Sequence, residues 1–383
     1  MNNSRRSAAV MLMMFLSTKE FPQKLLSGVS DRAFVQDVLY TAIRRLRTLR
    51  LILGRFVRKW PKGELEALLY VGAAQIIFMK NVPDFAAVNE TVAAAKQCDN
   101  PRIAKAVNAV LRNLIRKRSE IETMLGTLST EERESFPTEL VRRWNAAFGE
   151  EATAKMCSLY NIPAETYIAR KDGSFTVLER GVKVEDVPGY ADGDFIIQDP
   201  ATSHAVELLD IKTGTRVLDA CAAPGGKTVQ AAWRGANVVA CEINPRRRCV
   251  LQENISRTRV AVEVISSLDE ACARAPFDVV LVDAPCSNTG VFRRRPDARW
   301  NWSRGKLDEL VALQCAILDK VSGLVRSGGK IVYSTCSVET EENIRQVESF
   351  VSRRQDFVLG RIVQSLPFET GHDGAFAAEI LRR

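Results

Sequence analysis

Apolar residues recur at three- and four-residue intervals through the first third of the chain, a spacing that predicts helices with one buried face. The pattern runs through four stretches: 31–57, 64–81, 87–96 and 103–118. Pro61, Gly63 and Pro83 separate them with short breaks, which is typical of a compact helix bundle. We therefore expect residues 1–128 to form an all-α domain.

From about residue 206 the pattern changes to strands that alternate with helices. Five apolar stretches are predicted strands: 215–223, 237–244, 262–266, 277–285 and 329–337. Helices are predicted over 245–257, 306–326 and 338–354, the last with Ser337 as its N-cap. This alternation predicts a Rossmann-like α/β domain over residues 206–383, whose parallel sheet binds ligands beyond the carboxyl ends of its strands.

The residues between these two parts have a mixed pattern. The stretch 129–149 favours helix, whereas 165–171, 175–180 and 194–199 alternate in the manner of short strands. We expect a small connecting domain of α+β character over residues 129–205. The chain is thus predicted to be a multidomain protein.

The positive charge of the chain is concentrated near its beginning. Residues 1–120 contain 21 Lys and Arg but nine Asp and Glu, a net charge of +12, so the remainder carries −4 of the total of +8. The stretch 44–63 holds eight basic residues and no acid. A solvated helix face would show the same pattern, but we favour contact with RNA.

Cysteine and histidine usage limits the possible chemistry. The nine cysteines include no CxxC pair, so we expect free thiols and a reducing, cytoplasmic location. With only His204 and His372, a metal site has few candidate ligands and none is expected. Residues 8–16 are apolar but are followed by Lys19 and Glu20, which favours a helix over a signal peptide. The chain has no run of eighteen apolar residues, so we expect no membrane span. We also expect the protein to be a monomer.

The first predicted strand of the α/β domain leads into LDACAAPGGKT, residues 218–228. Gly225 and Gly226 let the backbone pass close to a ligand just before a helix begins. The stretch is no P-loop, because Cys221 stands where the first glycine is required. A nucleoside cofactor without a pyrophosphate fits better. Glu242, at the end of the second strand, is placed to bind the hydroxyl groups of a ribose.

Two cysteines follow the fourth and fifth predicted strands. Asp283 and Cys286 end the fourth strand and Cys336 ends the fifth. In the common strand order these strands are neighbours of the first, so the three side chains should converge beside the 221–227 loop. A free cysteine is usually a core residue, but one at this edge can be a nucleophile.

An arginine-rich stretch, RRRPDARW at 293–300, follows the first of these cysteines. Any one arginine could belong to a solvated loop. Several of them with Trp300 and Trp302 beside a two-cysteine site favour contact with an extruded base and its phosphates.

The stretches DACAAPGGKT, DAPCSNTG, RRPDARW, YSTCSVETEEN and GHDGAFAAEI resemble the signature segments of the Sun (Fmu, RsmB-like) family of S-adenosylmethionine-dependent RNA cytosine-5 methyltransferases. Segments within 30–46, 87–96 and 105–117 are similar to the NusB-like RNA-binding domain fused to the bacterial members that act on small-subunit ribosomal RNA. The resemblance covers most of the chain. It implies a class I methyltransferase domain over 206–383 and a NusB-like domain over 1–128.

The resemblance also implies roles for individual residues. Cys336 is the nucleophile that adds to C6 of the cytosine, and Cys286 helps to remove the C5 proton and release the product. Asp283 holds the base or the amine of the cofactor, and Lys227 orients the loop and the target. S-adenosylmethionine is expected to contact Cys221, Ala222, Ala223, Pro224, Gly225, Gly226, Lys227, Glu242 and Asp283, and RNA to contact Arg294, Arg295 and Arg299.

One departure from the family pattern leaves more than one function open. The family usually has an acid after the third strand, where this chain has Ser266 and Ser267, and Asp269 is a candidate substitute. A non-catalytic RNA-binding or ribosome-assembly factor on the same fold would fit this change, although it does not explain the retained cysteines. A transfer-RNA cytosine-5 methyltransferase and a small-molecule methyltransferase also stay open. The small-molecule enzyme would leave the basic N-terminal part without a role.

Overall fold

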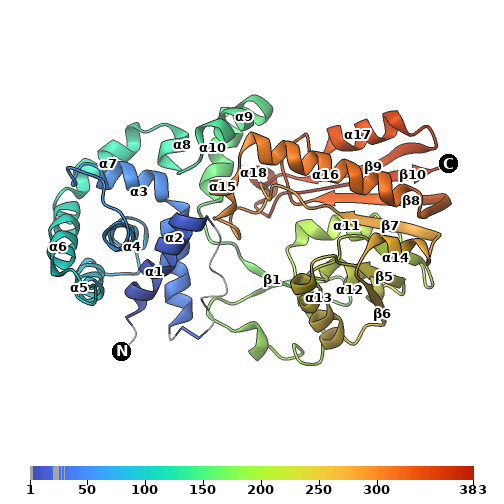
Figure 1. Cartoon of the computed structure of the whole chain (residues 1–383), viewed down its shortest axis with the longest axis horizontal. Helices are drawn as coiled ribbons and strands as arrows, with labels where there is room; N and C mark the ends of the chain where they lie inside the picture. Colours follow the sequence, from blue (N-terminus) through green and yellow to red (C-terminus); the bar gives the residue numbers. More distant parts are fainter. Residues whose placement is uncertain (1–2, 20–25, 27, 30) are drawn as a thin grey trace. The chain divides into compact units, whose positions relative to one another are not determined.

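The computed structural model describes residues 3–19, 26, 28–29 and 31–383 (Figure 1). The chain divides into two compact units. Unit 1 comprises residues 1–163 together with 293–301, and unit 2 comprises residues 164–292 and 302–383. The short segment 293–301 therefore leaves the sequence of unit 2 and packs as part of unit 1.

Unit 1 is helical throughout its described residues. Its helices are α1 (Ser4–Thr18), α2 (Arg32–Arg44), α3 (Leu46–Leu53), α4 (Glu64–Phe78), α5 (Asp84–Ala95), α6 (Pro101–Arg116), α7 (Arg118–Thr127), α8 (Thr130–Arg133), α9 (Thr138–Phe148), α10 (Glu150–Leu159) and α15 (Ala298–Asn301). Figure 1 shows α4 end-on, and α1, α2, α3, α5 and α6 all contact it. Residues 67–76 of α4 are buried without interruption, because this central helix has no solvent face. The predicted helix bundle is confirmed.

Close packing at the centre of the bundle depends on Gly72 of α4. A Cβ atom at this position would lie 2.4 Å from a methyl carbon of Leu111 on α6. Both Leu111 and Leu68 are completely buried. The absence of a side chain at Gly72 thus allows α4 and α6 to approach each other closely.

The predicted connecting domain is divided between the two units. Helices α8–α10 belong to unit 1, where Phe136, Trp144 and Tyr160 pack with ring centroids 5.7–6.2 Å apart. The strands β1 (Thr166–Arg170), β2 (Phe175–Leu178) and β3 (Phe195–Ile197) form an antiparallel sheet in the order β2-β1-β3 within unit 2. Along the chain, the division between the two compact units falls at 163–164.

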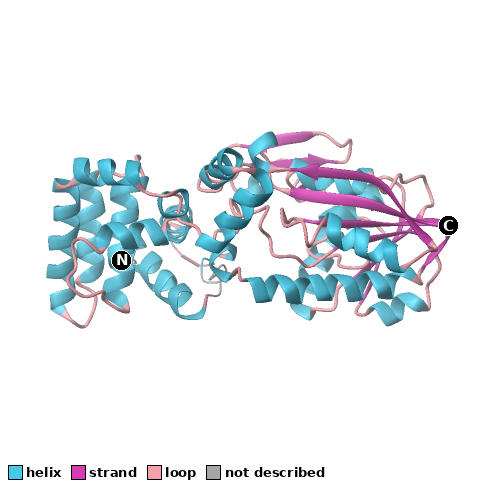
Figure 2. Cartoon of the chain, turned by 90° about the horizontal axis from the view of Figure 1, so that it is seen from above, coloured by secondary structure: helices cyan, strands magenta, loops and turns pink. Residues whose placement is uncertain are grey.

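The main sheet of unit 2 has seven strands in the order β6-β5-β4-β7-β8-β10-β9. Figure 2 shows the strands in magenta, with helices beside them. They are β4 (Arg216–Asp219), β5 (Asn237–Cys241), β6 (Val262–Ile265), β7 (Phe277–Asp283), β8 (Val325–Thr335), β9 (Phe357–Ser365) and β10 (Ala375–Arg382). The first five are parallel, and β10 pairs antiparallel with β8 and β9. The five predicted strands and their neighbours are confirmed; β9 and β10 were not predicted.

Helices cover both faces of this sheet. The helices of unit 2 are α11 (Ser203–Glu207), α12 (Gly226–Trp233), α13 (Pro245–Thr258), α14 (Leu268–Cys272), α16 (Arg304–Ser322), α17 (Ile344–Arg353) and α18 (Pro367–Thr370), with 3₁₀ turns η2 (Val184–Asp186) and η3 (Pro200–Thr202). Leu218 and Val280 pack in one core with Leu318 of α16 and Phe350 of α17. Their sequence neighbours Val217 and Val279 pack in a second core with residues of α11 and α12, as the alternation of side chains along a strand requires.

The last two predicted helices are shorter than expected. The helix α17 begins at Ile344, so the prediction that Ser337 is its N-cap was wrong; the N-cap is Asn343. Thr335 donates a hydrogen bond to Oδ1 of Asn343 (2.5 Å), and Nδ2 of Asn343 donates to the carbonyl of Ser337 (2.9 Å). These bonds hold residues 337–343 in turns beside the end of β8. The helix α16 ends at Ser322 rather than at 326 because β8 already begins at Val325.

Within the described ranges, every helix falls short of the length and apolar character that a membrane crossing requires. The same residues contain no group of three His, Cys, Asp or Glu side chains placed to hold a metal ion.

Candidate active site

The carboxyl ends of β7 and β8 bring two cysteines together. The strands run parallel, and Asp283 at the end of β7 is in register with Ser334 of β8. Each strand then leads into a loop, one with Cys286 and the other with Cys336. The two Sγ atoms lie 3.3 Å apart. The strand order therefore places the thiols next to each other, as the sequence pattern predicted.

A lysine–aspartate pair lies at the same edge of the sheet. Lys227, in the first turn of α12, places its Nζ 2.7 Å from Oδ2 of Asp283. Ser334 donates a hydrogen bond of 2.8 Å to the other carboxylate oxygen. Burial by itself would lower the pKa of Lys227, but the charge and hydrogen bond of Asp283 outweigh it and raise that pKa. Lys227 is therefore a fixed positive charge at neutral pH.

The two thiols have different surroundings. The hydrogen bond with Cys336, followed by burial, raises the pKa of Cys286 well above that of a free thiol. Sγ of Cys336 also lies 3.3 Å from Oδ1 of Asn288, to which it donates. Nδ2 of Asn288 donates to the carbonyl of Cys286 (2.9 Å). Asn288 thus connects the two cysteine loops.

The end of β4 forms a cradle for a ligand. Asp219 is only 1% exposed and accepts a hydrogen bond of 2.6 Å from Thr228. Burial raises its pKa to about 6. Gly225 follows with a φ of 108°, and a Cβ there would lie 2.8 Å from a methyl of Leu251. Only glycine fits this turn without strain, so bare backbone borders the cradle just before α12.

The loop of the cradle is held by α13. Nη2 of Arg247 donates to the carbonyl of Ala223 (2.7 Å), and Nδ2 of Asn254 donates to that of Pro224 (2.9 Å). Glu242, at the end of β5, is 4% exposed and accepts from the backbone amide of Asn244 (2.9 Å). The buried carboxyls of Asp219 and Glu242 thus follow two adjacent parallel strands.

Comparison with known proteins decides the family. The model of the 16S rRNA methyltransferase RsmB/F family matches residues 206–379, and the NusB family model matches residues 2–116. Ribosomal RNA small subunit methyltransferase B of Serratia proteamaculans is 31% identical over 404 residues, covering 94% of this chain and 92% of that protein. The chain belongs to the RsmB/F family. The protein of the same name from Klebsiella pneumoniae is 29% identical and covers 92% of this chain and 90% of its own length.

Solved structures share the fold of this RsmB/F-family chain. A crystal structure of PH0851 superposes with a TM-score of 0.78 at 19% identity and covers 99% of this chain and 98% of its own. NSun6 from Pyrococcus horikoshii, crystallised with the S-adenosylmethionine analogue SFG, has a TM-score of 0.57 at 17% identity and covers 65% of this chain and 99% of its own. The protein is thus an RNA cytosine methyltransferase that depends on S-adenosylmethionine.

The cradle has bare backbone at a glycine turn and a carboxylate acceptor, both of which fit S-adenosylmethionine. Neither glycine of this turn tolerates a side chain, since a Cβ would lie 2.8 Å from a methyl of Leu251 at Gly225 and 2.9 Å from Oε1 of Gln198 at Gly226. Glu242 offers a buried carboxylate for ribose hydroxyls. Of the two acids that follow Ser266 and Ser267, Glu270 rather than Asp269 contacts these serines. Asp269 is 81% exposed and pairs with Lys320 (2.8 Å), whereas Glu270 accepts from Ser266 (2.5 Å).

A buried glutamate supports the Cys286 loop and was missed in the sequence. Glu342 is completely buried and accepts from the backbone amide of Ser287 (2.8 Å), from the Ser287 hydroxyl and from Nε2 of Gln314 (3.0 Å). Gln314 also donates to the carbonyl of Pro285 (2.9 Å). The segment TEEN at 340–343 contains this glutamate, but nothing in the local sequence shows which of its two acids is buried.

Two glycines hold the loops at van der Waals distance. The amide of Gly290 donates to the carbonyl of Cys336 (3.0 Å), and the amide of Gly374 donates to the carbonyl of Gly290 (2.8 Å). A Cβ at Gly290 would lie 2.5 Å from the carbonyl oxygen of Gly374. The GHDG segment at 371–374 therefore packs directly on the cysteine loops.

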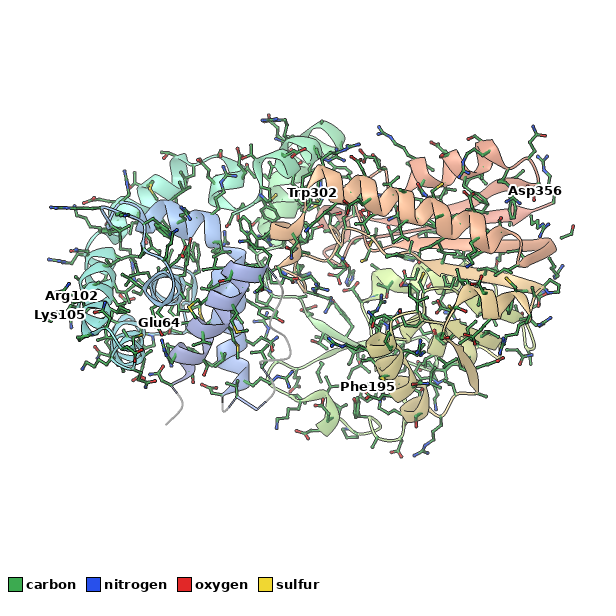
Figure 3. The ribbon with its side chains drawn as sticks, viewed as in Figure 1. Glu64, Arg102, Lys105, Phe195, Trp302 and Asp356 are labelled. Atoms are coloured by element: carbon green, nitrogen blue, oxygen red, sulfur yellow. The ribbon has the colours of Figure 1, made fainter. Side chains whose placement is uncertain are left out.

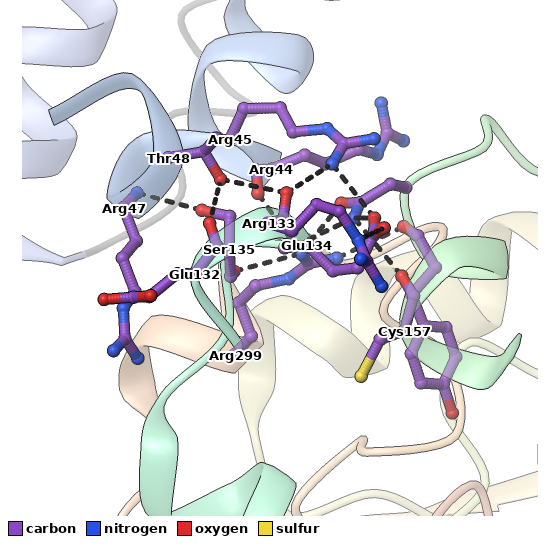
Figure 4. Close-up of polar contacts among 12 residues, drawn as sticks. Arg44, Arg45, Arg47, Thr48, Glu132, Arg133, Glu134, Ser135, Cys157 and Arg299 are labelled. Atoms are coloured by element: carbon purple, nitrogen blue, oxygen red, sulfur yellow. Dashed lines mark hydrogen bonds and ion pairs between the residues drawn. The ribbon is translucent and has the colours of Figure 1, made fainter. Parts of the chain in front are cut away.

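Arg299 does not serve the role that we predicted for it. Its side chain is completely buried in unit 1, where it donates to the carbonyls of Arg44 (3.2 Å) and Tyr160 (3.2 Å) and to Oδ1 of Asn161 (3.0 Å) (Figure 4). Its guanidinium lies 3.9 Å from the centroid of the Phe136 ring. The prediction that Arg299 contacts RNA is therefore wrong, because no part of it reaches the surface.

Other basic residues of the predicted RNA surface are also used within unit 1. Arg44 donates to the carbonyl of Arg293 (2.7 Å), Arg45 pairs with Glu134 (3.0 Å), and Arg47 donates to the carbonyl of Phe136 (2.7 Å). The first part of the 44–63 stretch thus holds α3 to the residues around α8. Arg294 is partly exposed, and Arg295 is exposed and pairs with the buried Asp297 (2.9 Å); their contact with RNA stays a prediction.

Proposed function

We propose that this protein transfers a methyl group to C5 of a cytosine in 16S ribosomal RNA, with Cys336 as the nucleophile. One observation carries the proposal: two thiols lie 3.3 Å apart beside the Lys227–Asp283 pair, at the ligand-binding edge of the sheet. A paired-thiol site suits a reaction in which one sulfur bonds to the base and another group must later take a proton.

The chemistry requires a covalent step because C5 of cytosine is a weak nucleophile. Addition of the Cys336 thiolate to C6 breaks the C5–C6 double bond and makes C5 nucleophilic. Bound S-adenosylmethionine supplies the electrophilic methyl group. After C5 is methylated, the C5 proton must leave so that the C6–sulfur bond can break. Cys286 is assigned this proton, since a thiol with a raised pKa becomes a strong base once it is ionised.

The remaining site residues position the reactants. The Lys227 ammonium lies close enough to Cys336 to interact with its charge, and so favours the thiolate at the moment of attack. Asp283 keeps lone pairs free after its bonds to Lys227 and Ser334, and we assign them to the amino edge of the base or the amine of the cofactor. The 221–227 loop and Glu242 hold the cofactor.

We propose that unit 1 binds the phosphates of the RNA through α6. This helix contains no acid, and one of its sides exposes Arg102, Lys105, Arg112 and Arg116. Figure 3 shows Arg102 and Lys105 pointing away from the bundle. Contact with phosphates releases counterions, so affinity for RNA should fall steeply with salt. We place the protein in the cytoplasm, where ribosomal RNA is its substrate, and expect it to act as a monomer.

The RNA surface is tested by changing Arg102, Lys105 and Arg112 to Gln together. We expect the slope of log affinity against log salt to fall by about two. Three exposed lysines of unit 2, Lys183, Lys212 and Lys306, changed to Gln provide the matched control. An unchanged slope in the α6 variant would remove α6 from the interface.

The reaction is tested with wild type, Cys336→Ala and Cys286→Ala, each incubated with S-adenosylmethionine and small-subunit ribosomal RNA. Methylated cytosine and a denaturant-stable protein–RNA adduct are both measured. We expect Cys336→Ala to give neither and Cys286→Ala to accumulate the adduct. Methylation of transfer RNA but not of small-subunit ribosomal RNA would show that transfer RNA is the substrate. RNA binding without methylation or cofactor binding in the wild type would favour a ribosome-assembly factor.

A further inference from the structure

Asn288 lies against the sulfur of Cys336 in a conformation that fixes the direction of its amide. Its backbone has a φ of 59°, in the left-handed region that Asn tolerates better than most residues. Its Nδ2 donates to the carbonyl of Cys286 at 2.9 Å. The reverse orientation would set two oxygen acceptors against each other. Oδ1 must therefore face Cys336, at 3.3 Å from its sulfur.

An amide oxygen distinguishes the two protonation states of a thiol. The thiol has a hydrogen to donate to Oδ1, whereas the thiolate has none and would meet the lone pairs of this oxygen. Asn288 thus stabilises the protonated form of Cys336. The hydrogen bond is made to the sulfur atom itself, so it acts directly on the balance between thiol and thiolate.

The other polar groups around Cys336 act in different directions. Lys227 favours the thiolate by its charge, although its ion pair with Asp283 reduces that effect. The thiol of Cys286 can donate to or accept from Cys336. The carboxylate of Glu342 lies behind the Cys286 loop, bound to Ser287, and its charge adds to the hydrogen bond and the burial that raise the pKa of Cys286. Asn288 is the neighbour whose contact with the sulfur is made only with the thiol.

We propose that Asn288 is a catalytic residue that keeps Cys336 protonated until the RNA base displaces the amide from the sulfur. The inference rests on the proposed role of Cys336 as the nucleophile. The RNA-free enzyme then holds a protonated thiol, which is alkylated slowly at neutral pH. Entry of the base removes the acceptor and leaves Lys227 as the dominant neighbour, so Cys336 loses its proton to solvent and the thiolate forms when its target is present.

Alkylation of Cys336 in the RNA-free, full-length protein tests this directly. The thiolate displaces iodide from iodoacetamide: the sulfur–carbon bond forms, the carbon–iodine bond breaks, and the thiol proton goes to the buffer. The modified fraction of Cys336 is measured by peptide mass spectrometry between pH 6 and 9. Exposed Cys249 serves as the internal reference for reagent and pH.

Two variants of Asn288 should move the profile in opposite directions. Asn288→Gly accepts the same φ and removes the acceptor. We expect its alkylation midpoint about half a pH unit lower and its rate at pH 7 about threefold higher, the effect of one weak hydrogen bond. Asn288→Asp places a carboxylate at the sulfur, so we expect a higher midpoint and slower alkylation than in the wild type.

A purely structural role would shift both variants in the same direction, because both remove the bond to Cys286. That result, or profiles identical to wild type, would overturn the proposal. Thermal unfolding shows whether each variant is folded. If only one variant folds, the direction in which its alkylation midpoint shifts still tests the proposal. If Cys336→Ala retains methyl transfer while the two Asn288 variants shift oppositely, the nucleophile assignment fails but the control of the thiol stands.

Discussion

The sulfur atoms of Cys286 and Cys336 lie 3.3 Å apart, although 50 positions separate the two residues in the chain. The proximity arises because β7 and β8 are parallel neighbours and both loops leave the sheet at the same edge. The raised pKa of Cys286 is a direct result of this contact. The site therefore contains two thiols in direct contact.

The thiol pair should form a disulfide under mild oxidation. Diamide accepts two electrons and two protons from the thiols, and we expect a peptide that links Cys286 with Cys336 and a parallel loss of methyl transfer. Dithiothreitol should restore the activity. A Cys315→Ala variant, which changes a thiol elsewhere in unit 2, should behave like the wild type. Disulfides formed only between other cysteines would contradict the geometry.

Replacing the buried Glu342 should impair the reaction more than the fold. In Glu342→Gln an NH₂ group faces the donors Ser287 and Gln314, which costs about 1–3 kcal/mol of stability. We expect kcat to fall at least tenfold, since the Cys286 loop loses its anchor, while KM for the cofactor changes little. Glu348→Gln, at an exposed position of α17, is the control. Wild-type kcat in Glu342→Gln would show that the loop does not need this anchor.

Arg299 should be essential for the stability of unit 1. Its guanidinium donates to four oxygens and packs on Phe136, so Arg299→Ala leaves buried acceptors without donors and opens a cavity. We expect a loss of about 3 kcal/mol or more, measured by urea unfolding. Arg102→Ala on exposed α6 should change stability by less than about 0.5 kcal/mol. Equal effects of the two changes would show that the buried network is dispensable.

Asp219 should make stability depend on pH. Its pKa in the folded protein is raised to about 6, so the folded state binds its proton more tightly than the unfolded chain does. This contribution to stability falls as pH rises from about 4 to 6 and is constant above that. Asp219→Asn, which still accepts from Thr228, should therefore gain about 1 kcal/mol more at pH 8 than at pH 5. Exposed Asp192→Asn should show no such difference, and equal gains at both pH values would contradict the shift.

Local sequence patterns predicted the elements whose secondary structure depends mainly on residues close together in the chain. The apolar strands β4, β5, β6, β7 and β8 followed from strand–helix alternation, and the neighbouring positions of β4, β7 and β8 followed from the common strand order. The strand β10 was not predicted, because AFAAEILR is a short, largely apolar stretch with three alanines and one glutamate, which periodicity cannot separate from a helix. The early end of α16 was also missed, since tertiary pairing of Val325 with Phe277 decides where β8 begins.

Charged residues show most clearly what local sequence patterns cannot predict. Arg102 and Arg299 look alike in the sequence, yet one lies on the surface of α6 and the other is completely buried. Glu341 and Glu342 are adjacent, but only the second is completely buried. The sequence shows the sign of each charge, but the residues that contact the charged side chain lie in distant parts of the chain.

The sequence by itself determined the helical first part, the parallel sheet and the placing of Asp283, Cys286 and Cys336 at one edge, because helix and strand periodicities are local and parallel strands end together. Only the tertiary structure decided that Asn288 binds the Cys336 sulfur, that Glu342 anchors the Cys286 loop and that Arg299 is part of a core. These contacts join residues from separate loops, and their geometry depends on how the whole chain packs.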